Sequence, residues 1–196
     1  MNNHLVGHES NILGEFKGAR FKCAVDVGAN DGLWSEFLAD ISSFVVCFEP
    51  HKKMYGRLLR KMCGRENFMA IPFAVSSLVG PARFYCRECP DHSSLNHDHP
   101  IPGTATPIEV ESVVNCVSLD GILNGIGLVV DFIKIDTEGT ELDVISSAKD
   151  VIRIHRPLFC IETHSSESHK EIVEMMANPK VMRYCDSGYV IGRFGI

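Results

Sequence analysis

The N-terminal part of the chain contains a turn whose residue types and spacing suit ligand binding, formed by Asp26, Gly28, Asn30 and Gly32. It follows a β-branched run and precedes apolar residues at helical spacing from Leu33, so it joins a strand to a helix. Glycine allows positive φ angles and leaves bare backbone against which a ligand can lie. The first amide groups of a helix also lack partners within the helix. The segment predicts a site for a nucleotide-type cofactor, with a plain strand–helix turn as the alternative.

The turn lacks the pattern of a dinucleotide site. Aligned on Gly28, the G-x-G-x-x-G fingerprint would need glycine in place of Asn30 and Leu33. Instead an acid, Asp26, stands two residues before the first glycine. A carboxylate at a strand end suits an ammonium or sulfonium group better than a pyrophosphate. A nicotinamide oxidoreductase is therefore disfavoured.

A second acid, Glu49, ends the next apolar run, Phe44–Phe48. It stands 21 positions after Gly28, close to where an acidic residue binds a ribose in strand–helix–strand nucleotide folds. We therefore predict that Glu49 contacts a ribose. The alternative is a solvated loop acid before the next helix.

Acidic residues gather after the apolar run Val129–Ile135, which delivers Asp136, Thr137 and Glu138 to its C-terminal end. Glu141 lies one turn into the helix expected to follow. Carboxylates crowded into a dry site repel one another unless a cation, a metal or a proton relieves them. The preference of helix N-termini for acids could explain Glu141 alone. Asp136, at a buried strand edge, is better explained as part of a binding pocket.

Four segments resemble the FkbM-type methyltransferase family: Val25–Asn30, Phe48–Pro50, Ser118–Asp120 and Lys134–Glu141. The last is the most specific, and the resemblance runs from about Phe21 to His164. It implies an enzyme of class I that uses S-adenosylmethionine, yields S-adenosylhomocysteine and usually methylates a hydroxyl oxygen, here of a small molecule or sugar. It implies that the cofactor contacts Asp26, Gly28, Ala29, Asn30, Gly32, Glu49, Pro50, Phe73, Ala74, Val75 and Asp136. Within this set, Phe73–Val75 would lie near the adenine and Asp136 at the pocket floor.

A hydroxyl is a weak nucleophile at neutral pH, so methyl transfer to it needs a base. His164, just beyond the expected strand Leu158–Ile161, is the first candidate, with Glu138 and His92 next and Asp136 beside them. Two alternatives keep the cofactor. In one, Asp136 and Glu138, with Glu162 as a third candidate, hold magnesium against the acceptor. In the other, the protein binds the cofactor without turnover.

Alternating apolar patterns predict an α/β fold, and the resemblance implies a Rossmann-like sandwich. We expect a mostly parallel sheet of about seven strands, the last one antiparallel, with helices on both faces. One domain would span residues 21–196, and residues 1–20 would form an N-terminal segment that is a capping helix or loose. Expected strands are 24–27, 44–48, 68–75, 82–86, 113–117, 129–135, 158–161, 181–185 and 189–194; expected helices are 33–41, about 51–63, 119–124 and 167–177.

Residues 76–111 are the least regular part and predict a mobile loop over the active site. Cys86, Cys89, His92, His97 and His99 resemble zinc ligands, but they crowd into 14 residues without the two spaced ligand pairs of usual zinc sites. We therefore assign no metal here and keep His92 and His97 as substrate-contacting candidates. Ser93-Ser94-Leu95 resembles a serine-rich stretch at this place in the family.

The composition of the 196-residue chain, 45% hydrophobic and 22% charged, is ordinary for a soluble globular protein. A net charge of −6 argues against nucleic acid as the main partner. No apolar run approaches the ~20 residues of a membrane span, and Met1–His4 does not begin like a signal peptide. Eight scattered cysteines suit a reducing, cytoplasmic setting. The expected partner is a small-molecule hydroxyl acceptor of open identity, and a homo-oligomer is left open.

Overall fold

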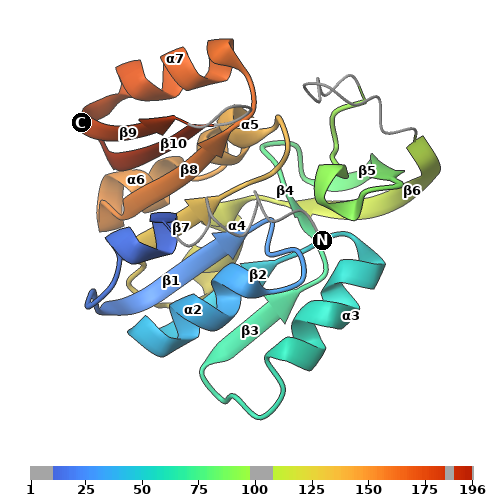
Figure 1. The fold of residues 1–196 in the computed structure, drawn as a ribbon, viewed down its shortest axis with the longest axis horizontal. Coiled ribbons are helices and arrows are strands. Elements are labelled where there is room, and N and C mark those ends of the chain that lie inside the picture. The colour runs from blue at the N-terminus through green and yellow to red at the C-terminus, as the bar shows by residue number, and fades with distance from the viewer. Residues whose placement is uncertain (1–10, 98–107, 184–187, 196) are drawn as a thin grey trace.

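A seven-stranded sheet forms the centre of the molecule, and the computed structural model describes the chain over residues 11–97, 108–183 and 188–195. The strand order is β3-β2-β1-β7-β8-β10-β9, and the last strand in sequence, β10, is antiparallel to both of its neighbours (Figure 1). The pairs from β3 to β8 are parallel. This arrangement confirms the predicted fold class. The strands are β1 Phe21–Val27, β2 Ser42–Phe48, β3 Phe68–Ile71, β7 Phe132–Ile135, β8 Leu158–Thr163, β9 Met176–Arg183 and β10 Gly188–Phe194.

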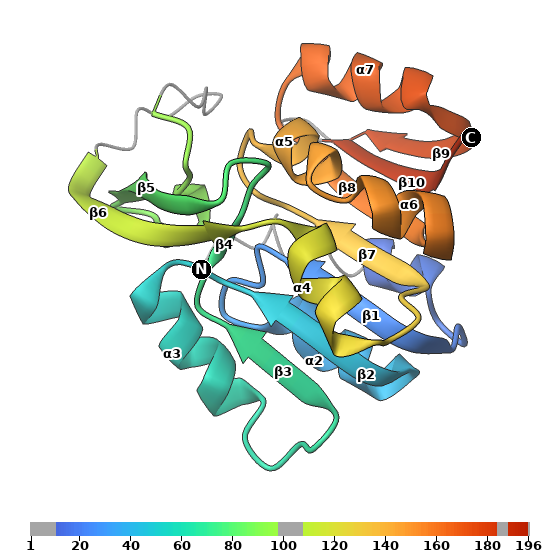
Figure 2. The same ribbon diagram turned by 180° about the vertical axis from the view of Figure 1, so that it is seen from behind.

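Helices cover both faces of the sheet, as Figures 1 and 2 show from opposite sides. One face is covered by α2 and α3 together with the helical residues 11–15, and the other by α4 to α7. The helices are α2 Leu33–Ile41, α3 Lys52–Lys61, α4 Leu119–Ile126, α5 Glu141–Ser146, α6 Lys149–His155 and α7 Ser166–Met175.

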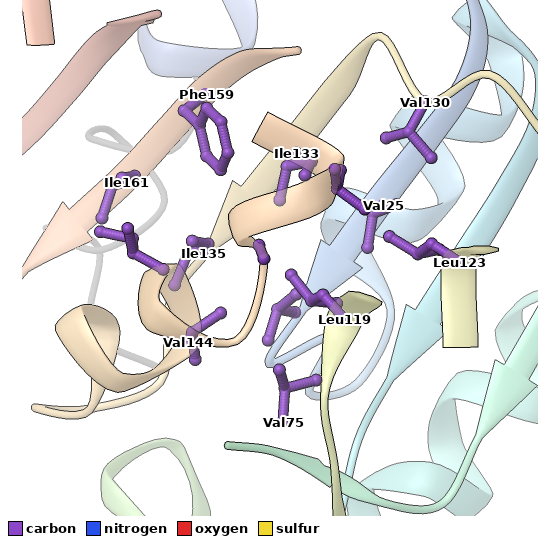
Figure 3. Packing of buried hydrophobic residues seen from close by; sticks show 14 of the residues in the cluster. Val25, Val75, Leu119, Leu123, Val130, Ile133, Ile135, Val144, Phe159 and Ile161 are labelled. Carbon is purple, nitrogen blue, oxygen red and sulfur yellow. The ribbon is translucent and has the colours of Figure 1, made fainter. Parts of the chain in front are cut away.

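Successive side chains of a strand point to opposite faces of the sheet, so strands that are apolar throughout give the sheet two apolar faces. Val25 pairs with Val46 on one side and with Ile133 on the other, and this row packs under α4. Figure 3 shows Leu119 and Leu123 of α4 lying against Val25. The neighbouring residues along each strand point to the opposite face.

The expected strand 68–75 is in fact two strands that belong to different sheets. β3 ends at Ile71, and Ala74–Val75 form β4, which pairs with β6 (Ile108–Val117) in a three-stranded sheet of order β4-β6-β5. Pro72 stands at the break, and proline lacks the N–H that would continue the first ladder.

Residues 76–111 are more regular than expected. β5 (Gly80–Arg87) includes the expected edge strand and pairs antiparallel with β6. Between them, the described residues contain one short 3₁₀ helix, η1 (Pro90–His92). Of the expected loop, residues 88–97 lie outside these two strands, and residues 98–107, including His99, lie outside the described residues.

Other expected boundaries shift by a few residues. The Ser118 side chain accepts a hydrogen bond from Gly121 N–H and caps α4. β7 begins at Phe132 rather than at Val129, and β9 begins earlier than expected, while Cys185 lies outside the described residues. At the N-terminus, the side chains of Ile12 and Phe16 are buried beneath the sheet's α2 face. None of the helices in the described ranges has the length and apolar character that crossing a bilayer would take.

Candidate active site

The glycine turn after β1 is held by the neighbouring strands. The N–H groups of Gly28 and Ala29 both donate to the carbonyl oxygen of Phe48 at 3.0 Å. Gly28 has φ 77°, and a Cβ atom there would lie 1.8 Å from the carbonyl oxygen of Asp136. Only glycine fits at this contact between the turn and the end of β7.

Three of the predicted cofactor residues lie behind the turn instead of lining a cavity. A Cβ atom on Gly32 would meet Leu58 Cδ1 at 2.8 Å, so this glycine lets α3 pack close to the turn. Ala29 is buried in the apolar cluster under α2. Asp26 is fully buried and accepts a 2.6 Å hydrogen bond from Ser35 Oγ. In the ligand-free protein these three residues support the turn, and their contact with the cofactor stays a prediction.

The remaining predicted cofactor residues line one cavity. The empty space inside it, including its open mouth, is about 600 Å³. The predicted residues on its wall are Gly28, Asn30, Glu49, Pro50, Phe73, Ala74, Val75 and Asp136. Sequence reasoning missed His51, Met54, Phe84 and Leu95, which also line it.

Glu49 is the most constrained acid on this wall. Its carboxylate accepts hydrogen bonds from Asn30 N–H at 2.7 Å and from His51 N–H at 2.6 Å. Burial raises the pKa of Glu49 to about 7, although these two hydrogen bonds oppose the rise. The side chain is therefore fixed at the cavity wall, where its oxygens can accept hydrogen bonds from a ligand's hydroxyl groups.

The segment after β5 lies along the cavity and is held there by side-chain bonds. Asn30 Nδ2 donates to Asp91 Oδ1 at 2.8 Å, which joins the glycine turn to η1. Ser94, which is 1% exposed, donates from Oγ to the carbonyl oxygen of Glu138 at 2.8 Å. The Ser93-Ser94-Leu95 stretch is thus attached to the residues that follow β7.

A cluster of charged side chains forms where β7 and β8 end. His164 Nε2 lies 3.6 Å from Asp136 Oδ1, 3.4 Å from Glu138 Oε1 and 4.0 Å from Glu162 Oε1. His164 Nδ1 lies 3.1 Å from Glu141 Oε1 on the other side of the ring. The structure brings together the predicted residues Asp136, Glu138 and His164, and Asp136 and Glu138 also line the cavity.

The protonation of His164 follows from these neighbours. Burial on its own would lower the pKa of His164, but the hydrogen bonds that the ring donates to Glu138 and Glu141 raise it well above the ordinary value. In Asp136, burial raises the pKa of the carboxyl, and the Lys134 ammonium opposes the rise. These carboxylates therefore favour the protonated form of the His164 ring in the ligand-free protein. The role of His164 as a base stays a prediction.

Lys134 is a site residue that sequence reasoning left without a role. It is buried, and its Nζ lies 3.3 Å from Asp26 Oδ1 and 3.4 Å from Asp136 Oδ2. Burial would lower the pKa of Lys134, but Asp26 and Asp136 raise it, so the ammonium stays charged. The sequence did contain a signal for this role, a lysine inside an apolar strand. Buried charges are almost always paired, so such a lysine predicts an acidic partner nearby.

The other candidates lie away from this cluster. His92 belongs to η1 and does not line the cavity, although Asp91 and Ser93 beside it do. The ring of His97 packs edge-on against Tyr85 at 5.0 Å. Within the described residues, Cys86, Cys89, His92 and His97 do not form a group of three or more metal-ligand atoms.

A mostly parallel sheet with an antiparallel last strand, whose glycine turn, Glu49 and Asp136 open on one cavity, defines the class I methyltransferase fold. The sequence from residue 26 to residue 191 matches the model of the methyltransferase FkbM domain. The chain belongs to the FkbM methyltransferase domain family.

Solved structures agree with this fold. An FkbM methyltransferase from Methylobacillus flagellatus KT superposes with a TM-score of 0.58 at 18% identity, over 87% of this chain and 43% of that one. The N-methyltransferase NodS from Bradyrhizobium japonicum WM9 gives a TM-score of 0.56 at 8% identity, over 100% and 99% of the two chains. A methyltransferase-like protein from Streptococcus mutans, solved in complex with SAH, gives 0.53 at 7% identity, over 90% of each chain. The present chain thus spans less than half of the FkbM structure, and a search of curated proteins found no match.

Proposed function

We propose that the protein transfers a methyl group from S-adenosylmethionine to a hydroxyl oxygen of a small molecule or sugar. The observation that carries this proposal is the single cavity shared by Gly28, Glu49 and Asp136, which lie at the carboxyl ends of three different parallel strands. Ligands of open α/β sheets bind at this edge. The Streptococcus mutans protein with SAH bound adds support from a similar fold.

The residues present fit this cofactor. Gly28 lies on the cavity wall, where its backbone can contact the methionine end, and the Glu49 oxygens can accept hydrogen bonds from ribose hydroxyls. Phe73, Val75 and Phe84 supply an apolar wall suited to a flat purine ring. Asp136 also lines the cavity, and a sulfonium beside it would favour the ionised form of its carboxyl.

S-adenosylmethionine, when bound, supplies a methyl group on a positively charged sulfur, from which an in-line displacement forms the new C–O bond as the C–S bond breaks. The chain's own residues must hold the acceptor oxygen in line and take its proton. With His164 protonated, the acceptor's proton passes to Glu138, which lines the cavity. When no metal ion is bound, the protonated His164 ring holds the Glu138 and Glu141 carboxylates in place.

Calorimetric titration of the full chain with S-adenosylmethionine, and separately with NAD, tests the cofactor assignment. We expect saturable binding of S-adenosylmethionine by the wild type and by Glu171→Gln, a control at an exposed acid of α7. Glu49→Ala should weaken binding about tenfold or more, because it removes charge-assisted hydrogen bonds. Binding of NAD, or unchanged affinity in Glu49→Ala, would contradict the assignment.

A second candidate function is cofactor binding without turnover. Such a protein would use the same cavity for the cofactor. It would bind S-adenosylmethionine but give no S-adenosylhomocysteine with a panel of sugars and small alcohols.

The acceptor is proposed to be a small molecule because the site is acidic, which disfavours a phosphate backbone. We further propose a reducing, cytoplasmic setting, supported by free thiols at all seven described cysteines.

A further inference from the structure

Metal-ligand side chains come together where β7 and β8 end. Asp136, Glu138 and His164 each offer one ligand atom, and these atoms all lie within 4.8 Å of one another. Ligand atoms about 2.1 Å from a common ion lie roughly 3 to 4 Å apart. The separations of 3.4 and 3.6 Å from His164 Nε2 to Glu138 and Asp136 fall in this range. We propose that Asp136, Glu138 and His164 bind a divalent cation.

The orientation of the His164 ring supports this site. Its Nδ1 faces Glu141 Oε1 at 3.1 Å, so Nε2 is turned toward Asp136 and Glu138. Glu141 is 1% exposed, and its Oε1 is itself fixed by a 2.8 Å hydrogen bond from Gly139 N–H. A buried carboxylate behind the outer nitrogen is the arrangement that orients metal-binding histidines in proteins.

Two buried carboxylate oxygens provide an independent observation. Asp136 Oδ1 and Glu141 Oε2 are shielded from solvent and accept no hydrogen bond from the described residues. The distance of 3.6 Å from Asp136 Oδ1 to His164 Nε2 is too long for a hydrogen bond. A buried oxygen without a partner costs free energy, and a cation between Asp136 and Glu138 would remove this cost for Oδ1.

Carboxylates outnumber basic side chains around the proposed cation site. Lys134 offsets part of the negative charge, but it also neutralises Asp26 and donates to Gly28 O. Tyr189 adds no charge, since its hydroxyl donates to Glu162. The carboxylates within 4.0 Å of the His164 ring are Asp136, Glu138, Glu141 and Glu162. This excess of carboxylates favours the binding of a divalent cation.

One imidazole and two carboxylates suit a first-row transition metal such as Mn²⁺ better than Ca²⁺ or Mg²⁺, which prefer oxygen ligands alone. Such an ion would bind the acceptor oxygen next to the cavity and ease removal of its proton. This catalytic role rests on the proposed function, whereas the cation site itself does not. Compared with the magnesium alternative considered from the sequence, His164 takes the place of Glu162 and a transition-metal ion takes the place of magnesium.

Titration of the metal-free full chain with Mn²⁺, followed by the electron paramagnetic resonance signal of free Mn²⁺, tests the proposal without cofactor or acceptor. We expect one Mn²⁺ per chain in the wild type and in Glu167→Gln, a control at an exposed acid on α7. Affinity should fall about tenfold or more in His164→Gln and in Glu138→Gln. Circular dichroism identifies any variant that fails to fold, and the other variant then carries the test.

The outcomes separate this inference from the proposed function. Stoichiometric Mn²⁺ binding that depends on His164 and Glu138 supports the cation site, even if S-adenosylmethionine does not bind. Absence of stoichiometric binding in the folded wild type, or equal binding in folded His164→Gln and Glu138→Gln, overturns the site. The methyl-transfer proposal then still stands or falls on the calorimetric titration with S-adenosylmethionine.

Discussion

Lys134 Nζ donates a hydrogen bond to the carbonyl oxygen of Gly28 at 2.9 Å, across 106 positions of sequence. In the sheet, Lys134 stands directly opposite Asp26 of the neighbouring strand, so the two form an opposite-charge cross-strand pair. Lys134 therefore ties the glycine turn of β1 to the acidic end of β7. Because its side chain is buried, water does little to screen these interactions.

Replacing Lys134 should destabilise the whole protein. Lys134→Met keeps most of the side-chain volume but leaves Asp26 and Asp136 without their shared cation, and breaking a buried pair in this way costs roughly 3 to 5 kcal/mol. We expect urea unfolding to show a loss of this size. Lys170→Met, at an exposed position of α7, should change the free energy of unfolding by less than about 0.5 kcal/mol. A loss below about 1 kcal/mol in Lys134→Met would show that the turn is held by other contacts.

Gly28→Ala should disrupt the turn, since the new Cβ atom would lie 1.8 Å from Asp136 O and the residue has φ 77°. We expect this variant to lose cofactor affinity and several kcal/mol of stability. Gly14→Ala is the matched control, because Gly14 is in the helical residues 11–15 and its Cβ would meet nothing within 4 Å. Thermal melts of the two variants check the contrast, and equal melting temperatures would contradict it.

The sequence predicted those parts of the fold and of the site that depend on a pattern within a single short segment. Alternating apolar strands, the glycine turn and the acids at strand ends predicted the fold and brought Gly28, Glu49 and Asp136 to one cavity. These signals are local, because the carboxyl ends of parallel strands meet at one edge of the sheet. The same reasoning placed Asp136, Glu138 and His164 together.

Long-range contacts were what the sequence could not supply. The split between β3 and β4 depends on which strand Ala74 pairs with, and its partner Cys116 lies 42 positions later. Gly32 has the residue type of a ligand-binding turn, but its closeness to Leu58 depends on the packing of α3. His164 was chosen as a base from its position alone, whereas its protonation depends on Glu138 and Glu141 of another segment.

Ser94 offers a test of the segment that lies along the cavity. Ser94→Ala removes the 2.8 Å hydrogen bond to the carbonyl oxygen of Glu138 in a buried place, a change worth about 1 kcal/mol. If the segment retains the cofactor, S-adenosylmethionine should dissociate about fivefold faster, as measured by stopped-flow displacement. Ser166→Ala, at an exposed position of α7, should leave the rate unchanged. An unchanged rate in Ser94→Ala would show that this bond does not limit release.

Glu49 should make stability depend on pH in a direction opposite to that of most carboxylates. Its pKa is raised by burial from 4.5 to about 7 in the folded protein, so between these values the folded chain holds a proton that the unfolded chain has released. Stability contributed by this group is therefore present below about pH 4.5 and is lost as pH rises through 7. Compared with Glu49→Gln, which cannot ionise, the wild type should lose about 3 kcal/mol more of its free energy of unfolding between pH 4.5 and pH 8. Urea unfolding across this range measures the difference. Parallel curves for the two proteins would mean that Glu49 ionises normally, and that its carboxylate is better solvated at the cavity wall than its 5% exposure indicates.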